Sequence, residues 1–245
     1  MIAALILGRG GSIGFPGKNT YKVVGRPMME YAILAAKNTP EIDEIYVSTD
    51  SDEIKEIGRK NKVNIIDRPA FLCTKEAKHQ DAMIHGYNYV KDLGKDIELI
   101  VLLQCNAPFI MAEQLSKGIQ VLRKHPEFDS AATVSEYSAF TPARARLIGK
   151  DGSIHNFLTQ DQLKGANSER DSQGDIYFTD GSFIVRPKCL DNIENGMLPY
   201  PWMGRSSYAI KNWGGFDVDV DWQIPQVESW LRKHGFTETS TPYDK

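Results

Sequence analysis

Cysteine is scarce in this 245-residue sequence, and basic residues are not in excess. The three cysteines, Cys73, Cys105 and Cys189, are far apart and odd in number, which argues against a disulfide scaffold or a Cys-based zinc site. The 29 Lys and Arg residues against 32 Asp and Glu residues give a formal charge of −3, so no overall basic field favours a nucleic acid. We therefore expect a cytoplasmic protein with no nucleic-acid partner.

Long apolar runs are also missing. The apolar start, residues 1–7, lacks the length of a membrane span and the basic flank of a signal peptide, so we expect no membrane association. The 20 glycines and 12 prolines are too few for collagen-like or low-complexity chains. With 41% hydrophobic residues, the chain suits a single domain over residues 1–245 that buries a sizeable core.

Short apolar segments alternate with helical patterns over the first half of the chain. Continuous apolar runs predict buried strands, and apolar residues three and four apart predict helices. Strands are expected at residues 2–7, 44–48, 63–66, 99–103, 130–135, 176–185 and 213–220. Helices are expected at residues 80–91 and 111–124, after residues 27 and 50, and around 227–231. The helix after Asp50 is expected to be capped by that side chain, with Glu53 three residues later. This alternation predicts a doubly wound α/β fold with a mostly parallel sheet, whose ligand crevice lies at the carboxyl ends of the strands.

Residues 136–175 interrupt this rhythm. The segment is long, polar and rich in turn-forming residues, and residues 149–152 are typical of a hairpin tip. A loop of this length inside a small domain usually carries function or contacts a partner. We expect a projecting arm at approximately residues 136–175.

A glycine-rich loop, residues 8–19, directly follows the first predicted strand. Glycines let backbone N–H groups approach a phosphate, and Arg9 and Lys18 add positive charge. The spacing is not that of a P-loop. It is not a dinucleotide fingerprint either, because Pro16 prevents a helix from starting there. A flexible surface turn is the alternative interpretation.

Two carboxylates lie near the other end of the chain. On the predicted strand over 213–220, Asp217 and Asp219 would project from the same face. Two converging carboxylates repel each other unless a cation lies between them, and oxygen ligands suit Mg²⁺. A charged strand edge is the alternative. Together, the loop and the acidic pair indicate nucleotide chemistry.

Six short motifs in order resemble those of one enzyme family. They are residues 9–12, 16–19, 48–50, 68–70, 102–104 with Pro108, and 217–219. The chain resembles the cytidylyltransferases that activate nonulosonic acids, namely the CMP-sialic, CMP-legionaminic and CMP-pseudaminic acid synthetases. The resemblance implies a Rossmann-like fold of the nucleotide-diphospho-sugar transferase type, and a homodimer that exchanges an arm. It also implies Mg²⁺-dependent transfer of CMP from CTP to the anomeric hydroxyl of an acidic nine-carbon sugar, with release of pyrophosphate.

The resemblance also implies roles for individual residues. Transfer would depend on Arg9, Lys18, Asp217 and Asp219, and the last two would bind the metal. The nucleotide would be bound by Arg9, Gly10, Gly11, Ser12, Lys18, Asn19 and Arg68. The sugar acid would be bound by Gln104, Arg144, Arg170 and Asp180.

The sequence departs from the family pattern at several positions. Relatives usually carry a lysine at the position of Ile13 and an asparagine at that of Asp180, and small hydroxyl residues where Lys78 and His79 stand. One hypothesis is that Lys75 or Lys78 restores the charge missing at Ile13. The alternatives are another nucleoside triphosphate, a Kdo-like sugar, or a catalytically weakened nucleotide-sugar-binding homologue. A nicotinamide oxidoreductase is disfavoured because Pro16 disrupts the dinucleotide turn.

Overall fold

Seven strands form one central sheet in the order β11-β7-β10-β6-β1-β4-β5. The computed structural model describes residues 1–12, 14–169 and 174–244. The sheet strands are β1 (Ile2–Leu7), β4 (Glu44–Thr49), β5 (Asn64–Asp67), β6 (Leu99–Gln104), β7 (Ser130–Glu136), β10 (Tyr177–Val185) and β11 (Ser207–Asn212). Two small hairpins lie outside the sheet, β2 (Lys22–Val23) with β3 (Arg26–Pro27), and β8 (Arg146–Ile148) with β9 (Ile154–Asn156). The α-helices are α1 (Met28–Lys37), α2 (Asp52–Lys60), α3 (His79–Asp92), α4 (Ala112–Lys124), α5 (Pro187–Asp191) and α6 (Ile224–Lys233).

The sheet is mostly parallel. Strand β1 pairs in parallel with β4 and β6, β4 with β5, and β11 with β7, whereas β10 runs antiparallel to both of its neighbours. Parallel strands need crossover connections, and α1, α2 and α3 lie in those between β1, β4, β5 and β6. The doubly wound α/β fold predicted from the sequence is confirmed.

Helices cover both faces of the sheet because successive side chains of a strand point to opposite sides. On one face, Ile2, Ala4 and Ile6 of β1 pack with residues of α1, α2 and α4. On the other face, Ala3, Leu5 and Leu7 pack with residues of α3 and α5. All six β1 residues are buried, so the strand that leads into the glycine-rich loop lies at the centre of the core.

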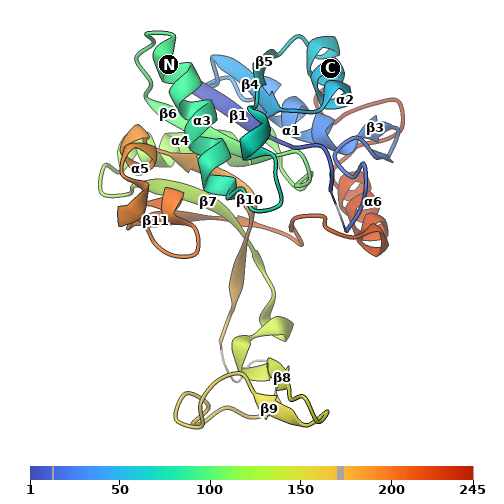
Figure 1. The fold of residues 1–245 in the computed structure, drawn as a ribbon, viewed down its shortest axis with the longest axis vertical. Coiled ribbons are helices and arrows are strands. Elements are labelled where there is room, and N and C mark those ends of the chain that lie inside the picture. The colour runs from blue at the N-terminus through green and yellow to red at the C-terminus, as the bar shows by residue number, and fades with distance from the viewer. Residues whose placement is uncertain (13, 170–173, 245) are drawn as a thin grey trace.

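A third apolar cluster lies beside the sheet. Strand β2, helix α6 and the segment after β6 contribute Val23, Val227, Trp230 and Phe109, and Val218 is buried among them. Figure 1 shows α6 and the β2–β3 hairpin on the same side of the molecule. The packing of this cluster therefore places α6, near the C-terminus, against β2, near the N-terminus.

The segment between β7 and β10 leaves the body of the protein. Its β8–β9 hairpin, with residues 149–152 at the tip as expected, lies far below the sheet in Figure 1. Several apolar side chains of this arm are exposed to solvent in the single chain: Phe140, Leu147, Ile148, Ile154 and Phe157.

Two local predictions are wrong. No strand forms over residues 213–220, because β11 ends at Asn212 and Gly214 takes a left-handed φ of 64°, which turns the chain away from the sheet edge. Asp50 does not cap α2, since its Oδ1 accepts a hydrogen bond from the Gly10 backbone N–H at 2.8 Å. The cap is Ser51, whose Oγ accepts from the N–H of Ile54.

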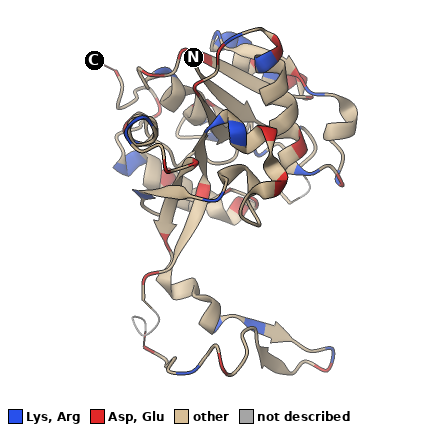
Figure 2. Ribbon diagram, turned by 90° about the vertical axis from the view of Figure 1, so that its left-hand side faces the viewer, with Lys and Arg blue, Asp and Glu red and all other residues tan. Residues whose placement is uncertain are grey.

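Charged residues of both signs are interspersed over the surface. Figure 2 shows lysines and arginines among aspartates and glutamates on the body, with no single-sign patch in this view. None of the helices in the described part of the chain is both long and apolar enough to cross a membrane.

Candidate active site

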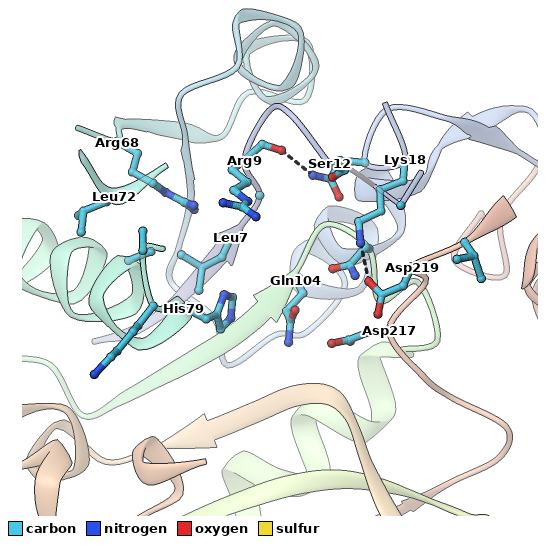
Figure 3. Close-up of a pocket in the computed structure, with 18 residues that line it drawn as sticks. Leu7, Arg9, Ser12, Lys18, Arg68, Leu72, His79, Gln104, Asp217 and Asp219 are labelled. Atoms are coloured by element: carbon cyan, nitrogen blue, oxygen red, sulfur yellow. Dashed lines mark hydrogen bonds and ion pairs between the residues drawn. The ribbon is translucent and has the colours of Figure 1, made fainter. Parts of the chain in front are cut away.

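A cavity of about 510 Å³ opens at the carboxyl ends of β1 and β6, where the sequence predicts the ligand crevice. Figure 3 shows Arg68, Leu72 and His79 at one end of it, and Lys18, Asp217 and Asp219 at the other. Its walls are formed by Leu7, Gly8, Arg9, Ser12, Gly14, Lys18, Asn19, Arg68, Leu72, Ala77, Lys78, His79, Ala82, Gln104, Asn106, Asp217, Asp219 and Val220. The end with Leu72 is thus partly apolar but also carries the Arg68 guanidinium, and the other end carries Lys18 and the two carboxylates.

The glycine-rich loop forms one wall of this cavity. Its path is fixed by hydrogen bonds from the Gly10 N–H to Asp50 and from the Asn19 amide to the Arg9 carbonyl, at 2.8 and 3.0 Å. At Gly8 a Cβ would lie 2.4 Å from Cys105 Sγ, so the loop leaves β1 at a point that only glycine fits. A smaller hollow of about 240 Å³ on the same loop is lined by Gly10 and Gly11, among others.

Two arginines are held at the end of the cavity away from the acidic pair. Arg9 donates hydrogen bonds to the backbone carbonyls of Cys73, at 3.2 Å, and Thr74. Arg68 is only 7% exposed, and it donates to the backbone carbonyl and hydroxyl of Ser48 at the end of β4. These bonds to backbone oxygens fix both guanidinium groups without neutralising them.

The acidic pair is the electrostatic centre of the site. The Lys18 ammonium lies 2.7 Å from Asp219 Oδ1. Asp217 Oδ1 is buried, and no hydrogen-bond donor in the described part of the chain reaches it. Burial first, and then the charge of Asp219, raise the pKa of Asp217 to about 6, against a smaller opposing effect of Lys18.

The two carboxylates could supply part of the ligand shell of a divalent cation. Within residues 1–12, 14–169 and 174–244, no group of three or more His, Cys, Asp or Glu side chains could hold a metal ion by itself. Mg²⁺ is commonly bound by one or two carboxylates, several waters and the phosphates of a substrate. The buried Asp217 oxygen without a partner suits such a cation.

The sequence profile described as cytidylyltransferase matches residues 3–161. The chain belongs to the cytidylyltransferase family. It is 26% identical over 244 residues to an N-acylneuraminate cytidylyltransferase of Oncorhynchus mykiss, covering 98% of this chain and 52% of that protein. It is 25% identical over 224 residues to an N-acylneuraminate cytidylyltransferase of Streptococcus agalactiae, covering 89% of this chain and 49% of that protein. The chain spans about half the length of these curated relatives, and the resemblance to CMP-sialic acid synthetases is confirmed.

The fold of this cytidylyltransferase family member also matches a solved structure. A CMP:2-keto-3-deoxy-manno-octonic acid synthetase complexed with CTP superimposes with a TM-score of 0.66 at 15% identity, covering 95% of this chain and 98% of that one. At this identity the match supports the fold, which is that of the nucleotidyltransferases with a Rossmann-like sheet.

Most of the site residues predicted for this family member lie together. Arg9, Ser12, Lys18, Asn19, Arg68, Gln104, Asp217 and Asp219 all line the cavity. Gly10 and Gly11 line the adjoining hollow. The two segments that the sequence arguments paired, the glycine-rich loop and the acidic pair, are therefore in direct contact.

Two predicted sugar contacts, Asp180 and Arg144, do not line the cavity of this chain. Asp180 is only 2% exposed and accepts hydrogen bonds from Ser135 and Asn212, so its carboxylate faces the protein interior. Arg144 belongs to the arm, where it donates to the Ser168 carbonyl at 2.9 Å. Arg170, like Ile13, lies outside the described residues.

Sequence reasoning missed Asn106 as a site residue. It lines the cavity two residues beyond β6, and its side chain reaches the segment between the two aspartates. A polar residue directly after the most apolar strand was the available signal, since loops at strand carboxyl ends carry ligand contacts in this class of fold. Lys78 and His79 also line the cavity.

Proposed function

We propose that this protein transfers CMP from CTP to the anomeric hydroxyl of a nonulosonic, sialic-acid-like sugar acid and releases pyrophosphate. The observation that carries the proposal is the contact of Lys18 with Asp219 at one end of a nucleotide-sized cavity, beside an Asp217 oxygen that no donor among the described residues reaches. Family membership supports cytidylyl transfer, and the names of the curated relatives support a nonulosonic acid as acceptor.

The nucleotide is proposed to lie along the cavity. Its base would occupy the partly apolar end near Leu72, with Arg68 and Asn19 as polar neighbours. Its triphosphate would extend toward Arg9, Ser12 and Lys18, where the backbone N–H groups of Gly10 and Gly11 add donors. Fixed positive groups at the β- and γ-phosphates stabilise the charge that develops on pyrophosphate as it leaves.

Asp217 and Asp219 are proposed to hold Mg²⁺. When bound, the cation would neutralise phosphate charge and favour ionisation of an attacking hydroxyl. Asp219 keeps Lys18 oriented, and the two carboxylates together would give the cation a fixed position. Because phosphoryl transfer needs alignment and charge neutralisation more than covalent help, these residues supply what the reaction requires.

The sugar acid is proposed to lie on the open side of the cavity next to Gln104. A guanidinium group suits its carboxylate because it donates two parallel hydrogen bonds. Arg144 is in the arm, and the exposed apolar arm residues favour a homodimer in which one copy's arm reaches its partner. We therefore propose that Arg144 and Arg170 act across such a dimer, and we retain the cytoplasm as the predicted location.

The identity of the acceptor sugar has one specific alternative. The CTP-bound structural neighbour is a 2-keto-3-deoxy-manno-octonic acid synthetase, and a 3-deoxy-manno-octulosonate cytidylyltransferase of Bdellovibrio bacteriovorus is 28% identical over 138 residues. A Kdo-like eight-carbon acid is thus the second candidate acceptor.

The deciding experiment is a matrix of the four ribonucleoside triphosphates against sialic, legionaminic, pseudaminic and Kdo sugar acids, with detection of pyrophosphate. The expected result is rapid release only with CTP and a nine-carbon acid. Release with Kdo would establish the second candidate. No release with any pair, from protein that binds CTP, would instead establish the weakened binding homologue.

A further inference from the structure

The segment that carries the two acidic residues is not part of the sheet. Residues 213–220 form no strand, yet both Asp217 and Asp219 line the cavity. A segment without ladder hydrogen bonds must be held by other groups if its side chains are to keep a fixed position. Two sets of contacts, one on each side of Asp217, do this.

The first set joins Asn106 to Val218. The Val218 N–H donates to the Asn106 carbonyl at 2.9 Å, and the Asn106 side-chain amide donates to the Val218 carbonyl at 3.1 Å. The Val218 side chain is 0% exposed and packs in the apolar cluster of β2 and α6. Val218 is therefore fixed through both its backbone and its side chain. The aspartates on either side of it line the cavity.

The second set joins Asp180 to the start of the segment. Asp180 Oδ2 accepts from the Ser135 hydroxyl and from the Asn212 amide, each at 2.9 Å. Ser135 Oγ in turn accepts from the Gly215 N–H at 2.8 Å. The pairing of β10 with β7 shifts register between Thr179 and Phe183, and this irregularity places Asp180 under the segment.

The residue after Asp180, Gly181, leaves space for the Asp217 carboxylate. Gly181 has a φ of 93°, and a Cβ there would lie 2.5 Å from Asp217 Oδ1. Only glycine adopts this backbone conformation without strain and leaves space for the carboxylate. Asp180 and Gly181 of β10 therefore limit the position of the Asp217 carboxylate, and Asn106 fixes the backbone of the next residue, Val218.

We infer that Asn106 and Asp180 are positioning residues, which hold the 213–219 segment so that Asp217 and Asp219 can bind one divalent cation. The inference rests on the cation-binding role in the proposed function. It also gives Asp180 a different role from the sugar contact that the family resemblance implies. Groups that orient metal ligands typically contribute 10- to 100-fold to metal affinity, although they never touch the ion.

Direct cation binding tests the role of Asn106. Mn²⁺ is titrated into the full chain in the presence of CTP, and bound Mn²⁺ is measured by water-proton relaxation enhancement. Asn106→Ala should weaken Mn²⁺ binding by about tenfold. The control, Asn61→Ala, removes an asparagine that also donates to a backbone carbonyl, that of Ile57, but lies at the end of α2; it should leave Mn²⁺ affinity unchanged. Equal Mn²⁺ affinity in Asn106→Ala and wild type would overturn the inference.

A pair of substitutions tests Asp180. An asparagine at this position keeps an oxygen that can accept from Ser135 and Asn212, so Asp180→Asn should bind Mn²⁺ within about threefold of wild type. Asp180→Ala should lose about tenfold. Ser135→Ala, which removes the hydroxyl that links Asp180 to the Gly215 N–H but leaves the Asn212 bond to Asp180, should lose several-fold. If all three bind Mn²⁺ normally and Asp180→Asn raises only the KM of the sugar acid, Asp180 is a sugar contact and the inference fails. Because near-UV circular dichroism verifies folding and Mn²⁺ binding needs no turnover, failure of the proposed transferase reaction would be distinguishable from failure of this inference.

Discussion

Lys18 Nζ lies 2.7 Å from Asp219 Oδ1, although 201 positions separate the two residues in the sequence. The ion pair joins the loop after β1 to the segment after β11, and so closes one end of the cavity. Asp219 remains largely exposed, so the pair by itself contributes little to stability. Under the proposed function, each partner would exchange this contact for a ligand: Lys18 for a phosphate and Asp219 for a cation.

Replacing Lys18 by methionine should lower kcat/KM for CTP about 100-fold, because a fixed cation at the leaving pyrophosphate is lost while the aliphatic stem is kept. Steady-state kinetics at saturating sugar acid measures this. Lys22→Met, an exposed lysine on β2, is the matched control and should behave as wild type. A Lys18→Met enzyme with normal kcat/KM would exclude the phosphate-binding role.

Asp217→Asn should lower kcat by about 100-fold or more, because the amide keeps the shape of the side chain but removes the charge that would hold a cation. The measurement is pyrophosphate release over a range of Mg²⁺ concentrations. Asp221→Asn, an exposed aspartate four residues away, should retain the wild-type rate. A near-normal rate of Asp217→Asn at saturating Mg²⁺ would remove Asp217 from the mechanism.

The raised pKa of Asp217 predicts a specific pH dependence of stability in the absence of divalent cations. The folded chain holds this proton up to a pKa of about 6, whereas the unfolded chain releases it near 3.8. Protonated Asp217 therefore favours folding at low pH, and that advantage is lost as the pH rises from about 4 through 6. Asp217→Asn should thus have a higher Tm than wild type at pH 7, by about 2–4 °C for each kcal/mol gained in the free energy of unfolding. Below pH 4 the two proteins should have the same Tm. Thermal scans from pH 3.5 to 8 check this, and a constant difference across that range would contradict it.

The two lysines that could compensate for the lysine missing at position 13 should differ in their effect on CTP binding. Lys78 lines the cavity, whereas Lys75 does not contribute to its walls. Lys78→Ala should weaken CTP binding about two- to fivefold, the scale of an exposed charge, and Lys75→Ala should leave it unchanged. Isothermal titration of CTP into both variants decides this. If neither variant changes the affinity, the idea that a lysine compensates for Ile13 is excluded.

The arm should mediate dimer formation. Sedimentation equilibrium of the wild type should give twice the chain mass of 27.5 kDa. Ile148 is 80% exposed on β8, so Ile148→Glu should shift the equilibrium toward the single chain. Leu93→Glu, an exposed apolar residue at the end of α3, is the control and should stay dimeric. A wild-type protein with the mass of one chain would refute the homodimer.

The elements that follow strong local patterns were predicted well from the sequence. The continuous apolar runs of β1 and β6 and the spaced apolar residues of α3 and α4 lie within two residues of their expected bounds. These elements are buried on both faces or along one stripe, so their hydrophobic pattern and their position in the core have the same cause.

The acidic segment shows where sequence patterns fail. The alternation of Asp217, Val218 and Asp219 resembles a strand, but its cause is different: Val218 packs against α6 and hydrogen-bonds to Asn106. Those partners are distant in the chain, and no local pattern encodes them. The interior position of Asp180 has the same origin, because Ser135 and Asn212 reach it only after β7, β10 and β11 have paired.

The joining of β1 and the 213–219 segment at one cavity has a consequence for synthesis of the chain. The loop after β1 is translated before the other strands of the sheet, whereas Asp217 and Asp219 follow its last strand, β11. A nascent chain therefore presents Arg9 and Lys18 without their acidic counterpart. If nucleotide and cation bind as proposed, they could stabilise the folded protein only once Asp219 has left the ribosome.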